Sequence, residues 1–257
     1  MTIRLLIFSL ALWPLLNSCS SAGSDEKNAL HSSHRTDSLI QLMLQAHGSH
    51  IVGQSSVSFD FRGRSYRSQR NGGAFQYERQ FADSSGAVVR DVLTNNGLFR
   101  EMDGERQPLT PKDSTAYAGS VNSVIYFALL PYFLQDKAVN AAYAGEAVLK
   151  GEPYHKIKVT FAEEGGGEDH EDVYVYWMHQ QQHTMDYLAY SYVVNGGGAR
   201  FREAYNVRSI EGLRIADYHN YKPMLDTRDV MVFDSLFEAG QMELLSEIEI
   251  RQITLSK

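Results

Sequence analysis

The sequence is almost free of cysteine, with Cys19 the single one among 257 residues. This excludes an intramolecular disulfide and leaves no second thiol for a metal site or a nucleophile. A long apolar run is also missing, because the stretch from Leu5 to Leu16 is shorter than the ~20 residues of a transmembrane helix. Basic charge is scarce: the formal net charge is −7. We therefore expect no nucleic acid among the partners.

The one cysteine stands in an informative place. The segment Leu16-Asn17-Ser18-Cys19 directly follows Arg4 and the short apolar run. A positive charge, a short apolar stretch and small residues before a cut are the layout of a signal peptide. A cysteine at this point is typical of a bacterial lipobox, although an ordinary secretory signal with a chance cysteine is the alternative. We expect residues 1–18 to be a lipoprotein signal peptide and Cys19 to carry the lipid anchor.

The residues after Cys19 indicate the cellular location of the protein. Residues 20–34 are polar and poor in apolar side chains, so we expect residues 19–34 to form a flexible tether. Ser20 stands where an aspartate would retain a lipoprotein in the inner membrane of some bacteria. The sequence therefore favours a membrane-anchored protein of the bacterial cell envelope, in the outer rather than the inner membrane. Residues 35–257 suit a single β-rich domain.

The hydrophobic pattern changes along this domain. Apolar residues recur with helical spacing from Asp37 to Gly48, which predicts an N-terminal helix. From Val57 onward they alternate as in strands, separated by turn signals such as Glu211-Gly212. The segment around Ile250 suits a last edge strand. We expect an α+β, mostly β fold with one large curved antiparallel sheet, a half-barrel.

Residues 111–136 break the strand rhythm. Val121, Ile125 and Phe127 belong to a helical pattern that is apolar nearly all round, so the helix must be buried or must cover something apolar. We expect this insertion to act as a plug or lid on the sheet. A core helix packed on the sheet and a lid over a hydrophobic cavity are the two interpretations.

Catalytic signatures are absent. The sequence has no G-x-S-x-G, no phosphate-binding loop, no dinucleotide fingerprint and no H-E-x-x-H. His179 and His183 flank a glutamine-rich turn, and the acidic residues 163–172 surround a Gly-Gly-Gly that suits a hairpin loop. We therefore predict no catalytic residue, no cofactor and no metal site.

Tyrosines are concentrated on four successive strand patterns between residues 174 and 221. Since aromatic residues occur on both faces, neither face of this sheet is simply wet. One face can pack on helices while the other lines a cavity. We predict a ligand site formed by the helical insertion and these strands, with the residues Val124, Tyr126, Phe127, Leu130, Tyr176, Tyr187, Tyr190 and Tyr192.

Two groups of arginines are open to two interpretations each. Arg200 and Arg202 alternate with Phe201, and an internal ion pair is favoured over contact with an acidic headgroup. The cluster from Arg62 to Arg70 is interpreted as the solvated face of an early strand rather than as an anion site.

Several segments resemble a domain-of-unknown-function family of lipoproteins common in Bacteroidota. They are residues 120–132 (SVNSVIYFALLPY), 151–161 (GEPYHKIKVTF), 186–192 (DYLAYSY) and 196–206 (GGGARFREAYN). The likeness extends from about Leu39 to Ile250 and implies no established activity or catalytic residue. By its order of elements, the chain also resembles the lipoprotein-carrier (LolA/LolB-like) half-barrel, which implies a curved sheet lined with apolar side chains.

Three hypotheses of function follow. The first is a lipid-anchored binding protein that holds a lipid or another hydrophobic ligand in a half-barrel cavity. The alternative is a non-enzymatic structural or assembly lipoprotein that interacts with an envelope protein complex. The third, an enzyme that uses a carboxylate with His155 or His219, has no residue spacing that forces the two groups together.

Overall fold

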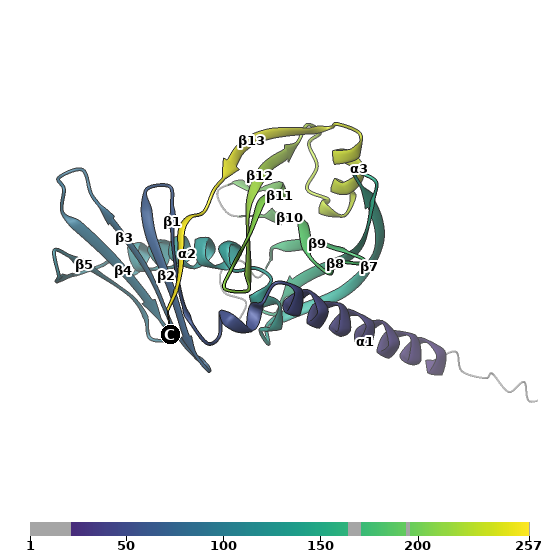
Figure 1. Ribbon diagram of the computed structural model, residues 1–257, viewed down its shortest axis with the longest axis horizontal. Helices are drawn as coiled ribbons and strands as arrows, with labels where there is room; N and C mark the ends of the chain where they lie inside the picture. Colours follow the sequence, from purple (N-terminus) through teal and green to yellow (C-terminus); the bar gives the residue numbers. More distant parts are fainter. Residues whose placement is uncertain (1–21, 164–170, 194–195, 257) are drawn as a thin grey trace, which may run out of the picture.

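The strands form two sheets, and one helix lies between them (Figure 1). The computed structural model describes residues 22–163, 171–193 and 196–256, with the side chains of the first helix described from residue 33 onward. The first sheet has the order β14-β1-β2-β3-β4-β5-β6, and the second has the order β13-β12-β11-β10-β9-β8-β7. All described strand pairs are antiparallel. The predicted class, mostly β and antiparallel, is confirmed.

The elements have the following bounds. The first sheet is built from β1 (Ser56–Phe61), β2 (Arg64–Asn71), β3 (Ala74–Ala82), β4 (Val88–Thr94), β5 (Gly97–Met102), β6 (Glu105–Gln107) and β14 (Arg251–Ser256). The second is built from β7 (Val139–Leu149), β8 (Glu152–Phe161), β9 (Val173–His179), β10 (Met185–Tyr192), β11 (Gly198–Ile210), β12 (Leu213–Pro223) and β13 (Met242–Ile248). The helices are α1 (Ala22–Ala46), α2 (Pro111–Ala128) and α3 (Phe233–Glu238), with short 3₁₀ turns η1 (Ser49–Ile51), η2 (Tyr132–Gln135) and η4 (Val230–Val232).

The division into two sheets differs from the single large sheet that the pattern predicts. The helical segment α2–η2 separates β6 from β7, so the meander is interrupted and restarts as a second sheet. The segment around Ile250, predicted as one last strand, is two strands. β13 pairs with β12 in the second sheet, and β14 pairs with β1 in the first.

The chain crosses from the second sheet to the first at Ile250. There, side chains form the hydrogen bonds to the backbone that a neighbouring strand would otherwise form. The Ile250 N–H donates to Asp217 Oδ1 at 2.9 Å, and the Ile250 carbonyl oxygen accepts from Arg208 Nη2 at 2.9 Å. Arg208 in turn pairs with Asp217 at 2.8 Å. The buried backbone groups at the crossing are therefore satisfied, which fixes the position of one sheet relative to the other.

Short turns join most neighbouring strands. At Arg62-Gly63, Asp103-Gly104, Lys150-Gly151 and Glu211-Gly212 both residues have positive φ. Two consecutive residues with positive φ are what a type I′ hairpin turn requires, and its twist matches that of the strands. The predicted hairpin at Glu211-Gly212 is confirmed.

Helix α1 is longer than predicted. It runs from Ala22 to Ala46, whereas the sequence pattern predicts a flexible tether up to residue 34 and a helix from Asp37. Residues 25–32 contain no proline or glycine, and half of them (Glu26, Lys27, Ala29 and Leu30) are good helix formers, so the helix can extend on its N-terminal side. At its C-terminus the helix ends at Ala46, and Gly48 follows shortly after. A Cβ at Gly48 would lie 2.2 Å from the Gly212 backbone oxygen, which no other residue could accommodate. Among the described residues, no helix is long and apolar enough to cross a membrane.

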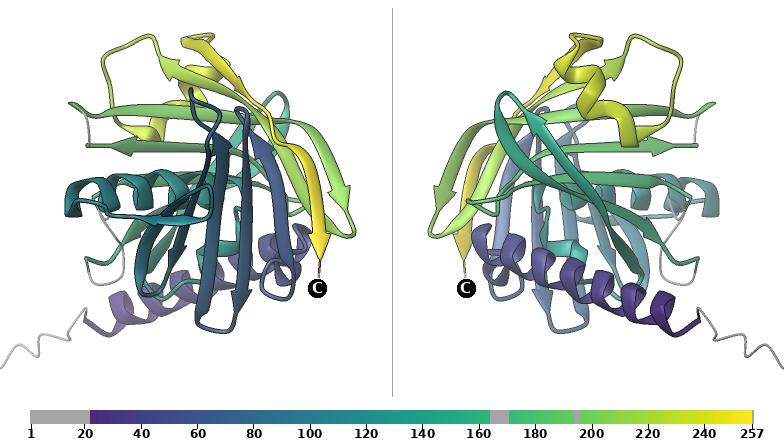
Figure 2. Two further views of the ribbon diagram at one scale, coloured as in Figure 1. Left: turned by 90° about the vertical axis from the view of Figure 1, so that its left-hand side faces the viewer. Right: turned by 90° about the vertical axis from the view of Figure 1, so that its right-hand side faces the viewer.

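Helix α2 lies on the first sheet and faces the second (Figure 2). Thr110 caps its N-terminus, since its side chain accepts from the Asp113 N–H. Val121 and Ile125 are fully buried in a core shared with β1, β2 and β3. The predicted helical insertion is therefore confirmed as an element wedged between two sheets.

The second sheet is covered on both faces. On its inner face, Tyr176, Leu188 and Met178 pack with α1 and the segment after α2. On its outer face, Trp177 and Phe201 pack under η4 and α3. The expectation that neither face of the tyrosine-rich sheet is wet is confirmed.

Candidate functional site

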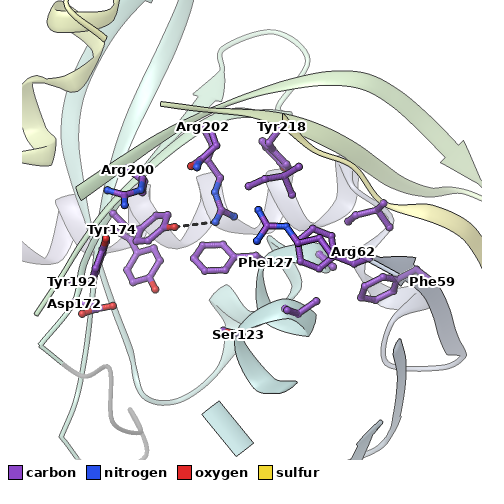
Figure 3. Close-up of a pocket in the computed structure, with 17 residues that line it drawn as sticks. Phe59, Arg62, Ser123, Phe127, Asp172, Tyr174, Tyr192, Arg200, Arg202 and Tyr218 are labelled. Atoms are coloured by element: carbon purple, nitrogen blue, oxygen red, sulfur yellow. Dashed lines mark hydrogen bonds between the residues drawn. The ribbon is translucent and has the colours of Figure 1, made fainter. Parts of the chain in front are cut away.

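A cavity of about 440 Å³ lies between the first sheet, α2 and the second sheet (Figure 3). Its volume is in the range of ordinary ligand pockets. The end of β1 forms one side, α2 forms the floor, and the inner face of β9–β12 forms the roof. The lining residues are Phe59, Phe61, Arg62, Ser123, Val124, Phe127, Ala128, Asp172, Tyr174, Tyr190, Tyr192, Arg200, Arg202, Tyr218, Asn220, Ile248 and Ile250.

The roof follows from strand register. Tyr190 on β10 faces Tyr174 on β9 and Arg200 on β11, so these three side chains share one face of the sheet. Residues two positions along a strand return to the same face, which adds Tyr192 and Arg202. The aromatic rings of Tyr174 and Tyr190 stack with centroids 5.5 Å apart. The inner face of the second sheet thus presents aromatic rings and two arginines to α2.

Phe127 is the contact between α2 and this roof. Its ring centroid lies 4.9 Å from that of Tyr190 and 6.2 Å from that of Tyr174. The guanidinium of Arg202 lies 4.0 Å above the same ring. A cation above an aromatic face is favourable, and Phe127 therefore holds both an aromatic and a cationic neighbour.

Burial keeps the phenols of Tyr218 and Tyr126 beside the cavity neutral. Burial raises the pKa of Tyr218 to about 12, although the charges of Arg214 and Arg202 oppose the shift. Burial also raises the pKa of Tyr126, which lies behind the cavity wall. Neutral phenols can donate or accept a hydrogen bond, but they do not compensate the charge of an arginine.

The predicted ligand-binding residues divide into three groups. Four of them line the cavity: Val124, Phe127, Tyr190 and Tyr192. Three others belong to the core beside it: Tyr126, Leu130 and Tyr176, with the Tyr126 and Tyr176 hydroxyls 3.3 Å apart. Tyr187 lies on the opposite face of the sheet, where it packs on Phe201 and Phe237. These placements make Tyr126, Leu130, Tyr176 and Tyr187 structural residues in the described fold.

The structure contradicts the internal ion pair predicted for Arg200 and Arg202 among the described residues and agrees with the exposure predicted for Arg62. Neither Arg200 nor Arg202 forms an ion pair with any residue that the structure describes. Arg200 donates to its neighbour's carbonyl, Ala199 O, at 2.7 Å, and Arg202 donates to the Tyr190 hydroxyl at 2.9 Å. Arg62, expected on a solvated face, is exposed but also reaches the cavity. The alternation of Arg200 and Arg202 with Phe201 is the signal that could have placed both in the site.

None of the described histidines lines the cavity. His219 Nδ1 lies 3.6 Å from Glu203 and His155 Nδ1 lies 3.6 Å from Glu146, and neither histidine is part of the lining. His179 Nδ1 accepts from the backbone of the glutamine turn that follows it. Within the described part of the chain, no three histidine, cysteine, aspartate or glutamate residues are close enough to hold a metal ion.

Two predicted features lie outside the described residues. Cys19, the predicted lipid anchor, precedes the first described residue, and most of the acidic segment 163–172 is also outside the description. Asp172, at the end of that segment, is described and lines the cavity near Tyr192 (Figure 3).

A family model with the description "Family of unknown function (DUF6503)" matches residues 6–250 of the chain. The expected membership of a domain-of-unknown-function family is thereby confirmed. No curated protein matches the sequence.

Three solved structures are similar to the chain at low sequence identity. A DUF1329 family protein from Desulfovibrio piger matches with TM-score 0.49 and 10% identity, over 85% of this chain and 92% of that one. A putative outer membrane lipoprotein-sorting protein domain from Vibrio parahaemolyticus matches with TM-score 0.41 and 5% identity, over 84% and 91%. The lipoprotein LppX from Mycobacterium tuberculosis matches with TM-score 0.26 and 14% identity, over 63% and 90%. At these TM-scores the likenesses carry no functional information.

Proposed function

Because the chain belongs to the DUF6503 family of unknown function, we propose its role from its own side chains. It is a lipid-anchored protein of the bacterial cell envelope that binds a lipid or another largely apolar ligand between its two sheets. The observation that carries this proposal is the 440 Å³ cavity, whose walls are mostly aromatic and aliphatic side chains.

The wall chemistry supports an apolar ligand. Val124 and Phe127 on α2 face Ile248 and the tyrosines of the second sheet across the cavity. Each 100 Å² of apolar surface that a ligand buries there contributes about 2.5 kcal/mol before the cost of association. An acyl chain or a comparable hydrocarbon segment can therefore be held by burial alone, without a reacting group.

The packing of α2 suggests how the cavity opens. Arg79 of the first sheet donates to Ser120 at 2.7 Å, and Arg100 lies 3.7 Å above the ring of Tyr117. Both contacts tie α2 to the first sheet. On the other side, contacts between α2 and the second sheet are made mainly by the rings of Tyr126 and Phe127. Ligand entry therefore separates α2 from the second sheet.

Photo-crosslinking of the full chain tests ligand binding. The protein is solubilised in a nonionic detergent and illuminated with a long-chain acyl probe that carries a diazirine in mid-chain. We expect cross-links on the tryptic peptide 113–137, which contains α2. Their absence from this peptide, with labelling confined to other parts of the chain, would contradict the proposal.

A pair of neighbouring tryptophan variants supplies the matched control. Ser123 lines the cavity, whereas Asn122 is exposed on the same helix and does not. Ser123→Trp fills part of the cavity and should reduce cross-linking by about tenfold, the effect of losing ~1.4 kcal/mol of binding. Asn122→Trp should leave cross-linking unchanged.

The anchor is tested separately. Growth with radiolabelled palmitate should label the wild-type protein and leave Cys19→Ser unlabelled, since Cys19 is the only thiol. A wild-type protein without label would overturn the proposed address and leave the proposed ligand site untouched.

The open edge of the second sheet favours a second candidate, an assembly protein with an envelope partner. β13 pairs only with β12 among the described strands, and its residues Leu244 and Leu245 are exposed. An edge strand with apolar side chains can add a strand from another protein. A photo-crosslinking amino acid at Leu244 should then capture one stoichiometric partner in the envelope, and the same amino acid at Val88 should not.

A further inference from the structure

Arg202 is a buried cation without a carboxylate partner. The residue is 9% exposed, and among the described residues its Nη2 donates only to the hydroxyl of Tyr190. Its Nε is buried and has no hydrogen-bond acceptor in the described structure. No carboxylate oxygen of a described residue lies within 4.0 Å of its guanidinium. The charge of Arg202 is therefore uncompensated by this chain as described.

An uncompensated buried charge is unfavourable. An arginine guanidinium does not escape this cost by losing its proton. Burying an unpaired ion costs more free energy than contact with the two aromatic faces of Phe127 and Tyr190 returns. Stacking on rings thus offsets only part of the cost. An anion that reached this guanidinium would recover the rest.

The position of Arg202 makes it accessible to a ligand. Figure 3 shows the Arg202 side chain extending from β11 into the cavity, with its guanidinium beside Phe127. The Arg62 side chain extends toward the same space from the end of β1. Two cations thus converge where the apolar floor of the cavity begins. Arg62 is more exposed and also borders a hollow lined by Asp60 and Glu247, so Arg202 is the stronger determinant.

We propose that the ligand is an amphiphile with an anionic head, a carboxylate or a phosphate, which Arg202 binds while the apolar tail lies along α2. Arg62 contributes to the same head from the opposite side. The planar fork of an arginine matches two oxygens of a carboxylate or phosphate. This inference rests on the proposed function, because it requires that the cavity take an apolar ligand at all.

Arg200 provides an internal control. It lines the same cavity, but its Nη1 donates to Ala199 O and its guanidinium lies over the ring of Tyr192, at the end where Asp172 is found (Figure 3). Arg200 is thus directed toward Tyr192 rather than toward a head held at Arg202. Neutralising Arg200 and neutralising Arg202 remove the same charge from the same cavity at two different places.

The experiment uses three diazirine probes with one acyl chain: a fatty acid, a lysophosphatidic acid and the methyl ester of the fatty acid. The full-length protein in nonionic detergent is cross-linked at alkaline pH, where both anionic heads are charged. We expect an anionic probe to label peptide 113–137 at least about tenfold more than the ester, since charge-assisted hydrogen bonds contribute ~1.5–3 kcal/mol. The more strongly labelling anionic probe identifies the head as carboxylate or phosphate.

The variants locate the head. Arg202→Gln should lower the anion-to-ester ratio to about one, Arg202→Lys should keep part of it, and Arg200→Gln should lower it less than Arg202→Gln does. The wild-type ratio needs no variant, so it stays informative even if Arg202→Gln folds poorly. Equal labelling of the wild type by acid, phosphate and ester would overturn the anionic head while leaving the apolar ligand. An unchanged ratio in Arg202→Gln would overturn the assignment to Arg202, and no labelling of peptide 113–137 by any probe would overturn the function itself.

Discussion

Two buried arginines face α2 from opposite sheets, and they differ in their hydrogen-bond partners. Arg79 on β3 donates to Asp91 at 2.5 and 3.0 Å and to Ser120 of α2 at 2.7 Å. Arg202 on β11 lies over Phe127 of the same helix and has no carboxylate partner among the described residues. The side chain of Arg79 is 4% exposed and Arg202 is 9% exposed, so depth does not explain the difference.

The difference indicates a division of labour between the two sides of α2. On the first sheet, Asp91 also accepts from Arg100 at 2.6 Å, so one carboxylate serves two cations and the helix is docked on a satisfied network. On the second sheet, the helix faces a cavity with unused donors. The first interface is therefore complete without a ligand, and the second becomes complete only when an anion enters.

Removing the carboxylate of the first interface should have the largest effect. Asp91→Ala leaves the buried Arg79 and the partly exposed Arg100 without their carboxylate, and breaking a buried pair in this way costs about 3–5 kcal/mol. Urea unfolding should show this loss in the free energy of unfolding. Arg202→Gln removes a buried charge that has no carboxylate partner among the described residues, so it should leave the free energy of unfolding unchanged or raise it. Equal losses in the two variants would show that the interfaces do not differ.

A buried base beneath the second sheet extends the comparison to pH. His47 at the end of α1 accepts from the Met185 N–H at 2.9 Å, and burial, with a smaller contribution from Arg214, lowers its pKa to about 3. Below pH 6.5, His47 is protonated in the unfolded state but stays neutral in the folded state. The contribution of neutral His47 to the free energy of unfolding is therefore present above pH 6.5 and is lost as the pH falls toward 3. By pH 5 the loss should be on the order of 2 kcal/mol.

Unfolding at pH 7 and pH 5 measures this loss, with His47→Gln as the control. The glutamine oxygen can still accept from Met185, but the side chain does not titrate. The variant should therefore lose less stability between the two pH values than the wild type does. The same loss in both proteins would show that His47 is not the responsible group.

The smallest effect is expected where α2 meets the first sheet. Ser120→Ala removes one hydrogen bond from Arg79 and should lower the free energy of unfolding by about 1 kcal/mol. It should leave the anion-to-ester ratio of photo-crosslinking unchanged, because Ser120 does not line the cavity. A change in this ratio would mean that the two sides of α2 are coupled.

The local elements could be predicted because their signals are local. The Glu211-Gly212 turn, the apolar helix at residues 111–128 and the doubly covered tyrosine strands all follow from short patterns. The division into two sheets could not be predicted, since it depends on the pairing of β1 with β14 across most of the chain. No sequence pattern within β1 or β14 indicates that these two strands pair with each other.

The site was only partly predictable for a related reason. Tyr190 and Tyr192 are two positions apart and share a face, whereas Tyr187 is three positions before Tyr190 and therefore faces the other core. Alternation alone could have separated them. That Arg202 has no carboxylate partner among the described residues could not be read from the sequence, because a partner could come from any neighbouring element; the adjacent Glu203 is not one. Glu203 instead points to the opposite face and pairs with Lys150.

A crystal structure of the full chain with a bound long-chain fatty acid or lysophosphatidic acid would test the central claim most directly. The account predicts electron density for the tail along Val124 and Phe127, with a headgroup oxygen within about 3 Å of the Arg202 guanidinium, an ordinary hydrogen-bond distance. A tail in the cavity with its head at the Arg200 end, or in solvent, would contradict the claim. So would a cavity that stays empty while the lipid binds elsewhere on the protein.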